Sequence, residues 1–130
     1  MGYLPALQDK LIVLVEDHDD LRNLLSQFLT RQGARVLASP NAADAFSLIQ
    51  RYRPSVVLLD IGLPDRNGFE LLQEIRALSP RKGGNVSVIA MTAFGGIVDR
   101  SRTVAAGFQG HLAKPFRPHE LLEALKSLLI

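Results

Sequence analysis

Short apolar segments alternate with amphipathic segments along this chain, and that alternation constrains the fold more than any other feature. The first apolar segment, residues 11–15, reads LIVLV and is followed at once by acidic residues. Because it is short and contains β-branched residues, we expect a strand that is buried on both faces. Strands of this kind belong to parallel sheets whose two faces are covered by helices.

The segment after this first strand has the spacing of an amphipathic helix. Its apolar residues recur with helical periodicity: Leu21, Leu24, Leu25, Phe28 and Leu29. We expect Asp19 or Asp20 to cap the N-terminus of this helix and Gly33 to end it. Strand and helix together form a first βα unit.

The same strand-then-helix pattern occurs four more times. Strands are predicted at residues 35–38, 56–59, 86–91 and 109–113, and helices at residues 41–52, 68–78, 97–106 and 117–129. Repeated βα units predict an α/β fold with a parallel sheet. We assign a single domain to residues 10–130 and interpret residues 1–9 as a loose N-terminal leader. Because the sequence ends on its last helix, we expect no output domain in it.

Composition excludes several kinds of chemistry. The chain has no cysteine, which rules out disulfides, thiolate metal sites and cysteine nucleophiles and suits a reducing compartment. No apolar run approaches the roughly 18–20 residues of a membrane span, so we expect a cytoplasmic protein with no membrane partner. The formal net charge is only +2, and the basic residues are scattered except for pairs such as Arg81 and Lys82. We interpret them as a solvated surface and expect no nucleic-acid partner.

Polar residues follow four of the predicted strands, at the point where each strand ends. They are Glu16 and Asp17 after the first, Asp60 after the third, Thr92 after the fourth and Lys114 after the fifth. Ligands of open parallel α/β sheets bind beyond the carboxyl ends of the strands. We therefore expect these side chains to meet in one pocket.

The residue types in this pocket suit phosphoryl transfer. Three crowded carboxylates repel one another unless a cation joins them, and an all-oxygen ligand set favours Mg²⁺ or Mn²⁺ over Zn²⁺. A lysine ammonium and a threonine hydroxyl can each contact a phosphoryl oxygen. Asp60 is then the natural nucleophile, forming an acyl phosphate.

Four stretches of the sequence resemble the response-regulator receiver family, at receiver-like spacing over essentially the whole chain. They are VEDHDD at residues 15–20, LDIGLPDRNG at 59–68, MTA at 91–93 and KPF at 114–116. The resemblance implies a flavodoxin-like (βα)5 fold, doubly wound, with the parallel strands in the order 2-1-3-4-5.

The resemblance also implies a metal site around the phosphorylated residue. Asp60 matches the aspartate that is phosphorylated, and Glu16 and Asp17 match the acidic pair that holds the metal. Gly62 matches the residue whose backbone carbonyl completes the metal site. These four residues are therefore the expected ligands of Mg²⁺ or Mn²⁺.

Further roles follow for residues after the last two strands. Lys114 matches the lysine that pairs with the phosphoryl group, and Thr92 matches the hydroxyl that moves toward it on activation. Pro115 matches a proline that commonly follows a cis peptide bond. One position departs from the family: the switch residue three before the lysine is often Tyr or Phe, and here it is His111. Its charge is sensitive to pH and its ring is smaller, which weakens an aromatic-switch account.

The function implied is that of a phosphoacceptor in a two-component system or phosphorelay. Asp60 would accept a phosphoryl group from a histidine kinase or a histidine phosphotransfer protein, and the surface that binds a downstream protein would change. We expect a signalling switch that catalyses its own phosphorylation and dephosphorylation rather than an enzyme. Residues 105–115 are similar to receivers of hybrid sensor kinases, but a stand-alone regulator and a phosphorelay intermediate stay open.

Two other functions fit the residues less well. An aspartyl-phosphate phosphatase would carry a second aspartate two residues after the nucleophile, where this chain has Gly62. A flavin-binding protein would need hydrogen-bond donors in the first loop, which here is acidic. His18 lies beside the acids, but oxygen ligands suit a hard cation better, so we interpret it as a partner contact.

Overall fold

The computed structural model describes residues 7–93 and 97–129. Its strands are β1 (Leu11–Val15), β2 (Arg35–Ser39), β3 (Val56–Asp60), β4 (Ser87–Thr92) and β5 (Gly110–Ala113). Its helices are α1 (Asp19–Arg31), α2 (Ala42–Tyr52), α3 (Gly68–Arg76), the short 3-10 helix η1 (Pro80–Lys82), α4 (Ile97–Ala106) and α5 (Pro118–Leu129). The five predicted βα units are confirmed, and η1 is the element of the described chain that the sequence did not predict.

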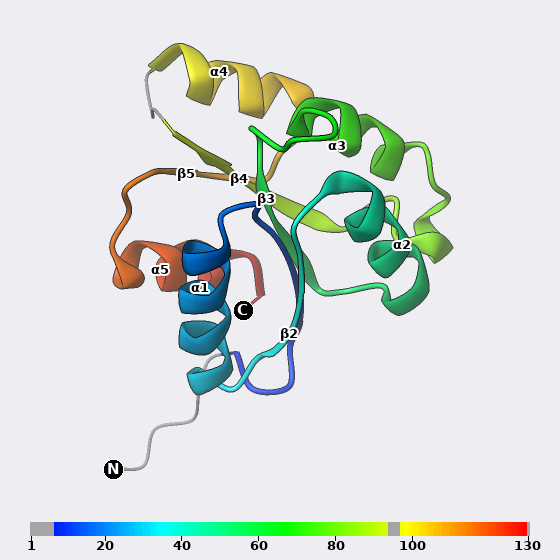
Figure 1. The fold of residues 1–130 in the computed structure, drawn as a ribbon. Helices are drawn as coiled ribbons and strands as arrows, with labels where there is room; N and C mark the ends of the chain where they lie inside the picture. Colours follow the sequence, from blue (N-terminus) through cyan, green and yellow to red (C-terminus); the bar gives the residue numbers. More distant parts are fainter. Residues whose placement is uncertain (1–6, 94–96, 130) are drawn as a thin grey trace.

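The strands form one parallel sheet in the order β2-β1-β3-β4-β5, as expected. Val13 of β1, for example, lies between Leu37 of β2 and Val57 of β3. Helices α1 and α5 cover one face of this sheet, and α2, α3 and α4 cover the other (Figure 1). The order of the strands reverses between β1 and β3, so the loops that follow these two strands flank the switch point of the sheet.

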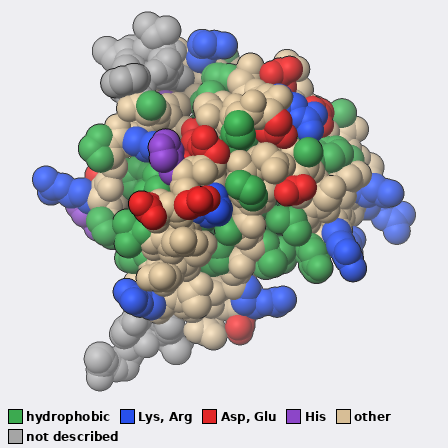
Figure 2. All heavy atoms as spheres, viewed as in Figure 1, with side chains coloured by type: hydrophobic (Ala, Val, Ile, Leu, Met, Phe, Trp, Pro, Cys, Tyr) green, Lys and Arg blue, Asp and Glu red, His purple; other side chains and the backbone are tan. Residues whose placement is uncertain are grey.

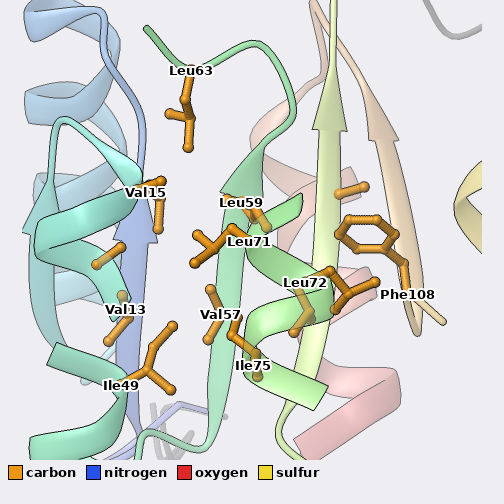
Figure 3. Packing of buried hydrophobic residues seen from close by; sticks show 14 residues of the cluster. Val13, Val15, Ile49, Val57, Leu59, Leu63, Leu71, Leu72, Ile75 and Phe108 are labelled. Carbon is orange, nitrogen blue, oxygen red and sulfur yellow. The ribbon is translucent and has the colours of Figure 1, made fainter. Parts of the chain in front are cut away.

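Alternate strand residues enter two separate cores because successive side chains of a strand point to opposite faces. Val13 and Val15 pack under α2 and α3 with Val57 and Leu59, as Figure 3 shows. Neighbouring strand residues on the opposite face pack under α1 and α5: Ile12, Leu14, Val56 and Leu58. All five residues of β3 are buried, which explains why that strand reads as a continuous apolar run ending in one acid.

The N-terminal segment differs from the expected loose leader. Leu7 is fully buried in the core beneath α1 and α5, and the backbone N–H of Asp9 donates to the carbonyl of Gly33 at 2.9 Å. Residues 7–9 are therefore packed against the domain, while residues 1–6 lie outside the described part of the chain. A single buried apolar residue leaves no periodic pattern, so it could not be recognised from the sequence.

The start of α1 also differs from its prediction, whereas the end agrees. His18 is the N-cap residue, without a side-chain hydrogen bond to the helix, and Asp19 and Asp20 lie in the first turn. The Asp19 carboxylate instead accepts a hydrogen bond from Arg22 at 2.6 Å, so its charge near the helix N-terminus is kept but its capping role is not. Gly33 follows the helix with φ 94°, a left-handed conformation that favours glycine.

In the described ranges, 7–93 and 97–129, none of the helices has the length and apolar character needed to cross a membrane.

Candidate functional site

Asp60 is a nearly buried carboxylate at the end of the central strand β3. Only 7% of the residue is exposed. Its Oδ1 accepts a hydrogen bond from the backbone N–H of Gly62 at 2.9 Å, and its Oδ2 lies 3.2 Å from Nζ of Lys114. Both oxygens are thus satisfied by donors, as a buried carboxylate requires. The contacts with Gly62 and Lys114 therefore hold this carboxylate in one orientation.

Glu16, the first residue after β1, lies beside Asp60 and is fully buried. Its Oε1 is 2.6 Å from Nζ of Lys114, and its Oε2 accepts from the backbone N–H of His18 at 3.0 Å. Burial raises the pKa of Glu16, although the hydrogen bonds from Lys114 and His18 oppose that shift. The Lys114 ammonium therefore joins the two buried carboxylates of β1 and β3.

Lys114 is held in this bridging position by its own backbone. Its N–H donates to the carbonyl of Thr92 at 2.7 Å, and the Lys114–Pro115 peptide bond is cis, as the resemblance implied. Burial acts to lower the pKa of Lys114, but the hydrogen bond to Glu16 and the charges of Asp60 and Glu16 outweigh it and raise that pKa. The Lys114 side chain therefore remains protonated, and its positive charge can attract an anion that enters the site.

Asp17 completes an acidic cluster that fits a hard divalent cation. Glu16, Asp17 and His18 each offer a ligand atom, and these atoms lie within 4.8 Å of one another. The Asp17 side chain is 33% exposed and the His18 side chain 80% exposed, whereas Glu16 is enclosed. Carboxylate oxygens on the open side suit Mg²⁺ or Mn²⁺, which keeps several waters. For Gly62, the contact in this structure is its N–H to Asp60; the metal-binding role of its carbonyl stays a prediction.

Arg22 was not singled out in the sequence, yet it fixes the loop that carries the acidic pair. Its Nη1 donates to the carbonyls of Glu16 at 2.9 Å and Asp17 at 3.5 Å, and its Nη2 donates to Asp19 at 2.6 Å. Its side chain is only 18% exposed. A guanidinium fork is suited to such a multiple contact. The sequence feature that could have indicated this role is the position of Arg22 three residues after Asp19, the spacing of one helical turn.

Asp65 anchors the second loop of the site to a different helix. Its carboxylate accepts hydrogen bonds from the backbone N–H groups of Ala42 at 2.9 Å and Ala43 at 3.0 Å, at the N-terminus of α2. Burial is the largest single influence and acts to raise the pKa of Asp65, but the backbone hydrogen bonds, chiefly from Ala42 and Ala43, together with the charge of Arg66 outweigh it and lower that pKa. The loop between β3 and α3, which carries Gly62, is therefore tied to α2.

The same loop closes tightly at Gly68, the first residue of α3. The N–H of Gly68 donates to the carbonyl of Ile61 at 2.8 Å. A Cβ on Gly68 would lie 2.8 Å from Cα of Ile61, closer than such atoms approach. The close backbone contact therefore requires glycine at this position. It allows α3 to begin next to Ile61, the residue that follows Asp60.

Thr92, at the end of β4, is linked by His111 to helix α4. The Thr92 Oγ1 is 3.2 Å from Nε2 of His111, and Nδ1 of His111 is 3.0 Å from Oγ1 of Thr103. The Thr103 hydroxyl donates to the carbonyl of Arg100 at 2.9 Å, so it accepts from Nδ1–H of His111. In a neutral imidazole Nε2 then accepts from the Thr92 hydroxyl. A hydrogen-bonded chain thus runs from the site to a buried residue of α4.

A cavity of about 700 Å³ opens above these residues. Its lining includes Asp17, Asp60, Thr92 and Lys114 from four strand ends. Figure 2 shows a histidine beside acidic side chains on the face turned to the viewer. Of the predicted site residues, Asp60, Glu16 and Lys114 are in direct contact, Asp17 adjoins Glu16, and Thr92 shares the cavity.

Comparisons with known proteins agree with this arrangement. The family model described as "Response regulator receiver domain" matches residues 12–126. An uncharacterized 14.6 kDa protein in the sodA1 3'region of Leptolyngbya boryana is 37% identical over 115 residues, covering 88% of this chain and 86% of that protein. Sporulation initiation phosphotransferase F of Bacillus subtilis is 29% identical, covering 95% of this chain and 96% of that protein.

A solved structure of similar shape contains a metal. It is the receiver domain of sensor histidine kinase PA1611 from Pseudomonas aeruginosa PAO1, with a magnesium ion coordinated in the active site cleft. Its TM-score is 0.84 at 32% identity, covering 93% of this chain and 98% of that one. Other curated relatives are longer, and the chain spans about half of their length, 56% and 48% in two probable transcriptional regulators of Porphyra purpurea.

The fold, the acidic strand ends and the match over most of the chain define a class of two-component signalling proteins. This chain belongs to the response regulator receiver domain family.

Proposed function

We propose that this domain is a phosphoacceptor that takes a phosphoryl group from a phosphohistidine onto Asp60. The observation that carries the proposal is the Asp60 carboxylate, which lines a cavity and has the Lys114 ammonium 3.2 Å away. A carboxylate oxygen of Asp60 forms the new O–P bond while the N–P bond of the donor breaks, and the donor imidazole leaves. The donor would be a histidine kinase or a histidine phosphotransfer protein.

The site residues divide the electrostatic work of this transfer. Lys114 offers its ammonium to a phosphoryl oxygen, and the Thr92 hydroxyl offers a second donor from the neighbouring strand. Glu16, Asp17, Asp60 and the Gly62 carbonyl would hold Mg²⁺ or Mn²⁺. When bound, the cation supplies positive charge that offsets the crowded carboxylates and phosphoryl oxygens. The magnesium-bound relative from Pseudomonas aeruginosa supports that assignment.

The hydrogen bonds of Thr92 suggest how the phosphoryl group changes the surface of the domain. If the Thr92 hydroxyl turns to a phosphoryl oxygen, it no longer donates to Nε2 of His111. The contacts of His111 would then change, and its hydrogen bond to Thr103 would carry that change to α4. We place the switch in residues 92–116 for this reason, with His111 in the role that an aromatic residue has in many relatives.

In this proposal the chain is a cytoplasmic signalling switch rather than an enzyme with a separate substrate. Its own residues catalyse both the gain and the loss of the phosphoryl group. Gly62, which occupies the position of a phosphatase's general acid, supports the switch over an aspartyl-phosphate phosphatase. The downstream partner would bind the surface that changes around α4 and β5.

The test is phosphorylation by a small acyl phosphate with Mg²⁺, followed by intact mass. Wild type and a Glu123→Gln control, changed at an exposed acid of α5, should each gain one phosphoryl group. Asp60→Asn should gain none, because its amide cannot form the acyl phosphate. Equal incorporation by Asp60→Asn and wild type would refute the assignment of Asp60.

A further inference from the structure

A second charged region lies at the end of the sheet opposite Asp60. There the C-terminal end of α2 and the helix η1 enclose a hollow of about 480 Å³. We call it the basic hollow; its lining residues are Gln50, Arg51, Arg53, Ser79, Arg81 and Lys82. Figure 2 shows lysine and arginine side chains gathered along the side of the molecule where Figure 1 places α2.

The charge of the basic hollow is not balanced within the domain. Four of its six lining residues are cations and none is an acid. Among the described residues, none of these four cations takes part in an ion pair. The whole chain carries only +2, so this local excess is not a reflection of a generally basic surface. Like charges in one concavity raise its affinity for an anion.

Backbone and ring contacts hold two of the four cations, Arg51 and Arg53, in place. Arg53 adopts a left-handed conformation, φ 46° and ψ 70°, at the C-cap of α2, where glycine or asparagine is the usual residue. Its Nη1 donates to the carbonyl of Arg81 at 3.3 Å, which ties α2 to η1. The Arg51 guanidinium lies 5.4 Å from the centre of the Tyr52 ring. Part of the ordering cost of binding is therefore already met in the free protein.

Helix electrostatics explain only part of this cluster. Arg51 and Arg53 lie at the C-terminal end of α2, where cations stabilise the helix dipole. Arg81 and Lys82 belong to the three-residue helix η1, which has little dipole of its own. Their convergence with the two arginines of α2 is not required by either helix, and it creates the hollow.

The lining chemistry selects oxygen anions. Guanidinium groups bind carboxylates and phosphates through two parallel hydrogen bonds, and the neutral side chains of Gln50 and Ser79 can add further donors. The cations are confined to residues 51–53 and 81–82. A nucleic-acid surface needs a longer basic stripe with aromatic platforms for successive bases. The compact hollow fits a short run of carboxylates better.

We propose that the basic hollow binds an acidic segment, rich in Asp and Glu, of a protein partner. Its position at the amino ends of the strands leaves the Asp60 site open, so a partner can be held at one end of the sheet while phosphoryl transfer takes place at the other. This inference does not depend on the phosphoacceptor proposal.

The test uses a fluorescent oligoglutamate peptide and fluorescence anisotropy at low salt. Arg51→Glu with Arg81→Glu should weaken binding at least about tenfold, because two attractive charges become repulsive. A matched control, Arg35→Glu with Lys126→Glu, makes the same change of net charge at exposed residues outside the hollow. It should stay within about twofold of wild type. If the control weakens binding as much as the hollow variant, the site is wrong.

Two further measurements keep the test decisive. Amide chemical-shift changes on adding the peptide to wild type should centre on residues 50–53 and 79–83; changes centred elsewhere would overturn the proposal. A single-stranded oligonucleotide of equal charge should bind more weakly than the peptide. Tighter binding by the oligonucleotide at the same amides would overturn the choice of an acidic protein segment.

If the variant Arg51→Glu with Arg81→Glu does not fold, Arg51→Gln with Arg81→Gln replaces it, with Arg35→Gln and Lys126→Gln as its control.

Discussion

The charged side chains at the two ends of the sheet differ in burial and in pairing. At the carboxyl ends, Glu16 and Asp60 are buried and share the ammonium of Lys114. At the amino ends, the cations of the basic hollow are exposed and make no ion pair within the described residues. Buried charges must be paired to be tolerated, whereas exposed ones are screened by water. At the carboxyl ends the residues of the proposed site also contribute to the stability of the fold, whereas the residues of the basic hollow can change with little effect on the fold.

The largest expected effect comes from Lys114→Met, which keeps most of the length of the side chain and removes its charge. Two buried carboxylates then face each other without a cation, which should cost about 3 kcal/mol of unfolding free energy at neutral pH. Urea unfolding measures this loss, and phosphorylation by a small acyl phosphate should be abolished. Lys126→Met, at an exposed position of α5, is the control and should change neither.

The pH dependence of that loss sharpens the comparison. Burial raises the pKa of Glu16, so the folded protein binds a proton more readily than the unfolded chain. As the pH falls toward the ordinary range of a carboxyl group, Glu16 becomes neutral and the repulsion in Lys114→Met is relieved. The difference in unfolding free energy between Lys114→Met and wild type should therefore become smaller at acidic pH. A gap that is constant with pH would contradict the buried-pair account.

A smaller effect is expected from Arg22, which binds the backbone of the acidic pair. Arg22→Ala should lower Mg²⁺ affinity about tenfold, as loss of a group that orients metal ligands usually does. Arg22→Lys keeps the charge but not the fork, so it should recover only part of the affinity. Isothermal titration with Mg²⁺ measures both, with the melting temperature as the check on folding. Equal affinities in all three proteins would show that Arg22 only stabilises α1.

Asp65→Ala should cost less, about 0.5 kcal/mol after solvent screening, because it removes a capping carboxylate at the surface. The pKa of Asp65 is lowered from 3.8. Its contribution is therefore present above that value and is lost as the pH falls through the lower pKa of the folded state. Urea unfolding at neutral pH and near pH 2 should show the difference from wild type shrinking. Asp65→Asn keeps one hydrogen-bond acceptor, so its unfolding free energy should lie between those of wild type and Asp65→Ala.

The smallest effect on stability is expected at the amino ends of the strands. Arg51→Glu with Arg81→Glu should change the unfolding free energy by no more than about 0.5 kcal/mol, since both side chains are exposed. Urea unfolding beside Lys114→Met makes the contrast direct. A loss of unfolding free energy comparable to that of Lys114→Met would contradict the proposed difference between the two ends of the sheet, because it would show that the cations of the basic hollow also stabilise the fold.

Much of the architecture could be predicted because it depends on local patterns. The first four residues of β3 are apolar and the last is Asp60, so both the burial of the strand and its candidate site residue are visible in the sequence. The gathering of Glu16, Asp60 and Lys114 follows from the rule that parallel strands bring their carboxyl ends together. Local periodicity and topology were sufficient for these features.

Features that depend on contacts between distant residues could not be predicted. Asp65 caps a helix that begins 23 residues earlier in the chain, and no local pattern distinguishes it from a solvated loop acid. Arg81 and Lys82 read as a solvated pair, because their convergence with Arg51 and Arg53 depends on how η1 lies against α2. The N-cap of α1 was missed for a local reason instead: α1 begins at Asp19, whose carboxylate accepts a hydrogen bond from Arg22 three residues later.

The ion pair of Lys114 with Glu16 joins residues 98 positions apart in the chain. During synthesis, which proceeds from the N-terminus, the acids after β1 and β3 emerge long before β5 can dock. Contacts of such sequence separation form late, because a long loop must first be closed. The pairing of these acids is thus a mark of completed folding. A chain truncated before β5 would keep Asp60 but lack the Lys114 ammonium that the proposed phosphoryl transfer requires.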